Sequence, residues 1–171
     1  MKHTRILLAV ILVLSLWFVV GCGKVAEKAV EKSIETGVEN SSGNDVKVDL
    51  DQNKVEIKDK DGTTYTSGGE QKWPKEMPSV VPEFKYGKII GVSNINSEKG
   101  KNITLSFESV DKNAYQSYKK DLEDAGWTIN MTSQFDTSWS LSAQKDKQMV
   151  TVTGGTDDSG ALLNYAENVD Q

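Results

Sequence analysis

The segment at residues 102–127, NITLSFESVDKNAYQSYKKDLEDAGW, predicts a strand followed by a helix. Its first seven residues alternate between polar and apolar side chains, so that Ile103, Leu105 and Phe107 share one side. Such alternation is typical of a β-strand that buries one face and exposes the other. Residues 102–108 are therefore predicted to form a strand whose apolar face is turned towards the core.

The rest of this stretch predicts an amphipathic helix. We expect Asp111 to cap its N-terminus. Gly126 is expected to end the helix in the left-handed conformation, with Trp127 folding back just beyond it. Between these ends, apolar residues recur three and four positions apart, which is the spacing of one helix face: Ala114, Tyr115, Tyr118, Leu122 and Ala125.

Further strands are predicted on both sides of the helix. A short strand at 88–93, around Ile89, Ile90 and Val92, precedes a polar turn at 94–101. Four strands are expected after the helix, at 127–133, 138–144, 147–153 and 161–166. The inward residues of the first two are predicted to be Trp127, Ile129, Met131, Trp139, Leu141 and Ala143. The last two of these strands are expected to form a hairpin. With that hairpin counted as one unit, the resulting β-β-α-β-β-β order predicts an α+β fold for residues 84–171, with one helix covering an antiparallel sheet.

Two segments precede this domain. Residues 45–66 show short alternating runs separated by turn sequences, which predicts a small β-meander or hairpin. Residues 67–83 hold all three prolines, so we expect an extended segment. Trp73 and Met77 could pin this segment across the domain as a belt, or Trp73, Pro74 and Met77 could form a ledge for a ligand or partner. The belt is favoured, because buried aromatic side chains more often serve packing than recognition.

The beginning of the meander resembles a calcium-binding loop. Asp49, Asp51 and Asn53 have the spacing with which an EF-hand loop starts. That loop needs glycine at its sixth position and glutamate at its twelfth, where this chain has Lys54 and Lys60. The sequence therefore predicts no calcium site here, and no other metal or cofactor site.

The N-terminus has the pattern of a bacterial lipoprotein signal peptide. Lys2 and Arg5 form a basic head, and the apolar run that follows is shorter than the roughly 20 residues of a membrane-spanning helix. Val19-Val20-Gly21-Cys22 then matches a lipobox. The match implies cleavage between Gly21 and Cys22, and attachment of a lipid such as palmitate to the Cys22 sulfur. Residues 1–21 are thus predicted to be the signal peptide, and the mature protein to be anchored to the outer face of a cell membrane.

Residues 22–44 are predicted to be a lipidated tether. Residues 24–35, KVAEKAVEKSIE, place lysine and glutamate three apart on a short helix. Gly37 and residues 40–44, NSSGN, are expected to end that helix and form a flexible linker. The helix is interpreted as a spacer; a short coiled-coil contact is the alternative, although sustained heptads are missing.

Composition narrows the classes of function. The net charge of −5 offers no basic surface, so a nucleic-acid partner is not expected. His3 is the only histidine and lies in the signal, and Cys22 is the only cysteine. This excludes, for the mature chain, histidine-dependent nucleophiles, zinc sites of histidine and cysteine, and disulfides.

The chain resembles a family of uncharacterised surface lipoproteins of Gram-positive bacteria. The resemblance rests on the lipobox, the Ala/Glu/Lys helix, Trp73-Pro74, residues 81–89 (VPEFKYGKI) and Gly126-Trp127 at the end of the second helix. It implies a small α+β domain and assigns no catalytic residue. Gly23, which follows the cysteine, agrees with a Gram-positive envelope.

Three classes of function follow from these observations. A binding or interaction module is favoured, whose partner is an unidentified protein or small molecule in addition to the membrane that holds the lipid. A structural or envelope-homeostasis lipoprotein is the alternative. A hydrolase is the third, resting on carboxylates near Trp73, for which solvated surface is the better interpretation: Glu70, Glu76 and Glu83.

Overall fold

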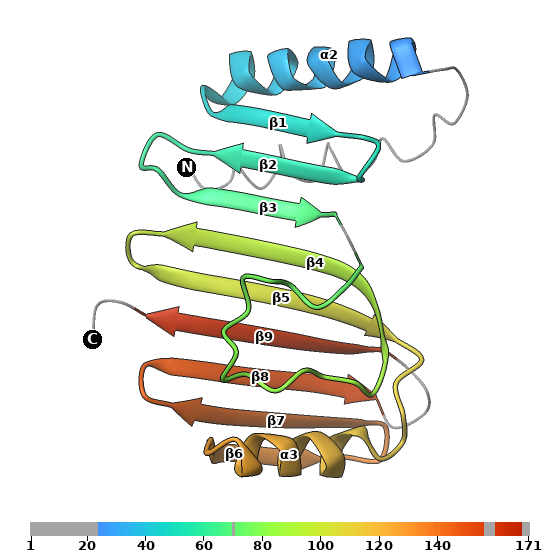
Figure 1. The fold of residues 1–171 in the computed structure, drawn as a ribbon, viewed down its shortest axis with the longest axis vertical. Helices are drawn as coiled ribbons and strands as arrows, with labels where there is room; N and C mark the ends of the chain where they lie inside the picture. The colour runs from blue at the N-terminus through green and yellow to red at the C-terminus, as the bar shows by residue number, and fades with distance from the viewer. Residues whose placement is uncertain (1–23, 70, 156–159, 169–171) are drawn as a thin grey trace.

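A computed structural model describes residues 24–69, 71–155 and 160–168. Nine strands form one antiparallel sheet in the order β1-β2-β3-β4-β5-β9-β8-β7-β6 (Figure 1). The strands are β1 (Asp45–Asp49), β2 (Lys54–Lys58), β3 (Thr64–Gly68), β4 (Lys88–Ser97), β5 (Gly100–Glu108), β6 (Thr128–Gln134), β7 (Ser138–Lys145), β8 (Gln148–Gly155) and β9 (Ala161–Asn168). The helices are α2 (Lys24–Ser42) and α3 (Ala114–Asp124). The predicted α+β class is confirmed, and β3–β4 pairing joins the meander to the rest of the sheet.

Residues 102–127, predicted to form a strand followed by a helix, fold largely as predicted. In β5, Ile103, Leu105 and Phe107 are buried. Gly126 has φ of +79°, and the Trp127 N–H donates to the Leu122 carbonyl at 2.9 Å, which closes the end of α3 as a left-handed cap.

The predicted cap at the start of α3 is wrong. The N-cap is Asn113, whose side chain makes no capping hydrogen bond. Asp111 lies two residues before this N-cap, and its backbone carbonyl accepts the Ala114 N–H at 2.9 Å.

Two strands differ from their predicted pattern. β4 continues to Ser97, so the predicted turn at 94–101 shrinks to the two residues between β4 and β5. Met131 is 53% exposed, although alternation from Trp127 placed it inside. A bulge between Ile129 and Met131 adds one residue to β6, which moves the following side chains to the other face.

The main core lies between the sheet and a strap, which we define as residues 71–87. Figure 1 shows the strap crossing β5, β9 and β8 on the side of the sheet where α3 lies. Met77, Val81 and Phe84 of the strap are buried in this core. The Tyr118 hydroxyl donates to the Pro82 carbonyl at 3.0 Å, and the Trp127 indole N–H donates to the Val80 carbonyl at 2.9 Å. The belt interpretation is therefore confirmed.

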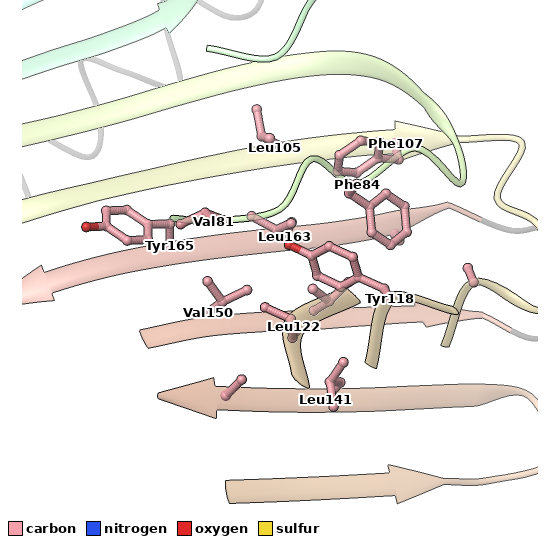
Figure 2. Packing of buried hydrophobic residues seen from close by; sticks show 14 of the residues in the cluster. Val81, Phe84, Leu105, Phe107, Tyr118, Leu122, Leu141, Val150, Leu163 and Tyr165 are labelled. Atoms are coloured by element: carbon pink, nitrogen blue, oxygen red, sulfur yellow. The ribbon is translucent and has the colours of Figure 1, made fainter. Parts of the chain in front are cut away.

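Side chains from the strap, the sheet and α3 fill the space between them. Phe84 lies 4.6 Å from Phe107 and 5.0 Å from Tyr118, measured between ring centroids. Figure 2 shows Phe84, Phe107 and Tyr118 clustered above the strands, with Leu122 and Leu141 nearby. Tyr118, Leu122 and Leu141 have no exposed surface.

Helix α2 covers the edge strand β1. It extends to Ser42, so Gly37 and residues 40–42, predicted to lie in a flexible linker, are helical. Its glutamates approach β1 at intervals of one turn. The Glu35 carboxylate accepts the Val48 N–H at 2.9 Å, and the Glu31 carboxylate accepts the Leu50 N–H at 2.8 Å. The edge is thereby closed to other strands by a helix of its own chain.

Candidate functional site

The strand register shows which residues lie on which of the two faces of the sheet. Residues paired directly across strands share a face, and neighbours along a strand alternate between faces. Ile103, Tyr165, Val150 and Ala143 form one continuous row on the core side, beneath the strap and α3. The alternate residues of the same strands therefore lie on the opposite face.

That opposite face of β4, β5, β9, β8 and β7 is the candidate functional site, and we name it the neutral face. It consists of three rows, each with one residue from every strand. The rows are Ile95-Asn102-Ala166-Met149-Gln144, Ser93-Thr104-Asn164-Thr151-Ser142 and Gly91-Ser106-Leu162-Thr153-Ser140.

None of the residues in these three rows carries a charge, in a chain of which 26% of residues are charged. The solvent-facing side of β1–β3 is different, because Lys47 and Lys54 lie 3.9 and 3.8 Å from the Glu56 carboxylate there. Exposed surfaces ordinarily mix both signs of charge. These charged residues lie on the opposite face of the sheet. The face that carries the neutral rows is also uncharged at β1–β3, where Val46, Val48 and Ile57 are buried, and it becomes polar and solvent-exposed from β4 onwards.

Hydroxyl and amide groups of the neutral face are joined by hydrogen bonds. The Asn164 amide donates to Thr104 Oγ1 at 2.9 Å and to Asn102 Oδ1 at 3.0 Å. Ser142 and Thr151 share a bond of 3.3 Å between their hydroxyls. Each hydroxyl has one donor and two acceptor positions, so these bonds fix the side chains and leave further capacity for a ligand on the half-buried Thr104 and Thr151. Ser142 is only 8% exposed and serves mainly to hold Thr151.

Apolar groups flank the polar middle row. Leu162 is 54% exposed and Met149 44% exposed, one in each outer row. At the end of the Leu162 row lies an open hollow of about 390 Å³ whose walls are mainly apolar. Ser106, Thr153 and Leu162 contribute to its walls, as do the half-buried Gly155 and the exposed Gly160. Its volume falls in the range of small-ligand sites.

The residues of the predicted ledge lie on the strap. Met77 is buried in the core and is only 6% exposed, so its side chain cannot meet a ligand. Trp73 is partly buried against that core, and Pro74 is half-exposed. A ledge made of Trp73 and Pro74 alone stays a prediction. Gly21 and Cys22, together with the other residues of the predicted signal peptide at 1–21, lie outside the described residues.

The carboxylates that favoured a hydrolase do not form a described pair. Glu76 and Glu83 are exposed on the strap, and Glu70 lies outside the described residues. Within residues 24–69, 71–155 and 160–168, no three histidine, cysteine or acidic side chains gather as metal ligands would. In the same part of the chain, no helix has both the length and the apolar composition needed to cross a membrane.

The tyrosines with perturbed acidity belong to the core side. Burial raises the pKa of Tyr86 to about 12, and the hydrogen bond that its hydroxyl donates to Asp121, at 2.6 Å, adds to the rise. Burial also raises the pKa of Tyr118 and of Tyr165. These hydroxyls stay protonated at neutral pH and act as hydrogen-bond donors within the fold.

The neutral face was not among the sites predicted from the sequence. The signal was present in the outward positions of predicted strands, where Ser140 and Ser142 stand in place of the usual lysine or glutamate. A strand taken alone gives only two or three such positions. The pattern becomes significant once the register brings five strands together.

Comparison with known proteins gives one match. Residues 89–160 are similar to the START domain-like family. The matched residues include α3 and four of the five strands of the neutral face, β4, β5, β7 and β8. Searches among curated proteins and among solved structures found no match. The similarity to this family thus covers less than half of the chain.

Proposed function

We propose that the protein is a membrane-anchored bacterial lipoprotein whose extracytoplasmic domain binds a ligand through the neutral face. The observation that carries this proposal is the absence of charge from all three rows of that face. The centres of binding surfaces are depleted of charged residues, whereas surfaces that only meet solvent are not. The START-like match over most of these strands supports a ligand-binding module independently.

The filled core directs binding to the surface. Beneath the strap and α3, Tyr118, Leu122 and Leu163 have no exposed surface. A ligand in that position would have to displace close-packed side chains, at a cost of several kcal/mol. The neutral face and its hollow, in contrast, already meet solvent.

The anchor is proposed to be the lipid on Cys22. Helix α2 begins at Lys24, two residues after this cysteine, and lies against β1 through its glutamates. The lipid would therefore hold the sheet near its β1 edge. The strands of the neutral face follow from β4 onwards, so the binding surface would extend away from the anchor.

Photo-crosslinking in intact cells tests the binding surface without assuming a ligand. A benzophenone amino acid replaces Leu162 on the neutral face, and in the control it replaces the exposed Lys58 on β2. We expect a product of higher mass from position 162 and none from position 58. No product from position 162, or equal products from both, would contradict the proposal.

Substitution of the cysteine tests the anchor. The Cys22→Ser variant should keep its signal peptide and appear in the medium, because both lipid attachment and the signal cleavage that follows it depend on the thiol. Mass spectrometry and cell fractionation measure the two effects. Normal cleavage with normal membrane retention would overturn the lipoprotein assignment and leave the neutral face unaffected.

A further inference from the structure

We propose that the ligand of the neutral face is an uncharged glycan chain. This inference rests on the proposed function and names the chemical class of its ligand. Its basis is the distribution of hydroxyl, amide and apolar groups over the three rows, together with the hollow at one end.

The charge pattern selects a neutral partner. A phosphate, a nucleic acid or an acidic polysaccharide would lose hydration on this face and find no cationic side chain to compensate it. The protein is itself acidic, with a net charge of −5, which further disfavours anions. An uncharged partner has no ionic hydration to lose and is not repelled by the acidic protein.

The middle row supplies the chemistry for a polyol. Ser93, Thr104, Asn164, Thr151 and Ser142 follow one another across the five strands. Sugar hydroxyls both donate and accept, and so do serine, threonine and asparagine side chains. Because neighbouring strands lie about 4.8 Å apart, the row repeats its polar groups at about the length of one sugar residue. Such a row suits an extended chain better than a single small molecule.

The outer rows supply apolar contacts. Met149 and Leu162 are exposed on either side of the middle row, where the C–H faces of sugar rings can rest on them. The hollow beside Leu162, with its bare glycine backbone, has room for a ring substituent such as an acetamido group. Hydrogen bonds from Asn164 to Thr104 and between Ser142 and Thr151 fix the orientation of these polar groups before a ligand binds, which lowers the entropic cost of binding.

A second copy of the chain fits this face less well. Two sheets that pack face to face need an apolar centre. On β4, β5, β9, β8 and β7 the central row is entirely polar, and the exposed Met149 and Leu162 lie in the outer rows. The central row meets an exposed apolar side chain only at its β6 end, where Met131 pairs with Ser142. A face-to-face dimer would therefore bury a row of hydroxyl and amide groups against another such row.

Retention on insoluble neutral polysaccharides tests the inference. The full-length chain in detergent is applied to chitin, cellulose and mannan, with heparin–agarose as the anionic counter-probe. Three variants are compared: Thr151→Lys in the middle row, Ser140→Lys in an outer row, and Thr66→Lys. Thr66 lies in the row of Lys47 and Glu56 on the charged side of β1–β3, so it is the matched control. Thermal unfolding checks that each variant is folded.

We expect the native chain and Thr66→Lys to be retained on at least one neutral polysaccharide and to pass through heparin. Thr151→Lys and Ser140→Lys should lower retention roughly tenfold, because a lysine charge would be desolvated beneath the ligand. Retention by none of the three polysaccharides, or equal retention of all variants, would overturn the glycan assignment. A dimer by light scattering that Thr151→Lys dissociates would assign the face to a second copy instead. Crosslinking at position 162 without polysaccharide retention would leave the proposed function standing and remove only the glycan.

Discussion

At the scale of single residues, the contacts of side chains with the strap explain how an irregular segment is held in place. The Tyr86 hydroxyl donates to Asp121 of α3, and the Tyr118 hydroxyl donates to the backbone of Pro82. Each bond links the strap to the helix that lies beside it on the sheet. Both tyrosines donate these bonds only while their hydroxyls are protonated, so the packing of the strap depends on pH.

The raised pKa of Tyr86 predicts a loss of stability at high pH. The hydroxyl ionises near pH 10 in the unfolded chain and near 12 in the folded protein, so folding favours the protonated form. Its contribution is complete below pH 10 and disappears as the pH rises towards about 12. We expect the Tyr86→Phe variant to lose less stability than the native chain across this range. Urea unfolding at successive pH values measures the free energy of unfolding of each variant, with Tyr65→Phe as the control. If this free energy falls with pH equally in Tyr86→Phe and in the native chain, ionisation of Tyr86 does not cause the loss.

At the scale of elements, the strap and α2 complete the sheet in different ways. The strap contributes buried side chains to the main core, whereas α2 supplies carboxylates to an edge and a few apolar residues to a second cluster. That second cluster contains Val46, Val48 and Ile57, which the register places on the same face as the neutral rows. One face of the sheet is thus apolar at β1–β3 and polar from β4 onwards.

Replacing a side chain of the strap by alanine is expected to destabilise the protein more, the more deeply that side chain is buried. Phe84 is 2% exposed and contacts Phe107 and Tyr118, so Phe84→Ala should lower the free energy of unfolding by about 3–5 kcal/mol. Trp73 is only partly buried, and Trp73→Ala should cost less. Denaturant unfolding measures both. A larger loss for Trp73→Ala than for Phe84→Ala would mean that the strap is held chiefly at its other end.

The glutamates of α2 are expected to protect the backbone of β1. Glu35→Ala removes the acceptor of the Val48 N–H, which should cost roughly 1 kcal/mol and speed hydrogen exchange at that amide. Glu35→Gln is the matched control, because its side chain keeps a carbonyl oxygen that can accept the same bond. Hydrogen exchange followed by NMR measures the effect. Unchanged protection of Val48 in the alanine variant would show that the helix does not cap this edge.

Local patterns in the sequence were sufficient to predict most of these strands and helices. Alternation located β5 and β7, and Gly126 located the end of α3, because each depends on neighbours within a few residues. The bulge that exposes Met131 and the continuation of α2 through Gly37 depend on pairing and docking. Tertiary contacts decide such cases, and they overrode the local preference for alternation and for a break at glycine.

At the scale of the whole molecule, the neutral face is a property of strand order. β5 pairs with β9, which follows it only after α3 and three further strands, and so Thr104 comes to lie beside Asn164. Neither the order nor the register can be read from one strand. The sequence therefore predicted the class of fold and part of the core, such as Ile103, Tyr118 and Leu141, while the candidate site required the assembled sheet.

Binding of a ligand by the neutral face, as proposed above, is best examined in intact cells. We would compare the yield of photo-crosslinking from position 162 among the native background, Thr151→Lys and Thr66→Lys. Thr151 is diagonal to Leu162 on the neighbouring strand, and Thr66 lies on the other face of the sheet. If the neutral face binds the ligand, Thr151→Lys should abolish most of the product and Thr66→Lys should leave it unchanged. An equal yield in all three backgrounds would show that the ligand does not bind there.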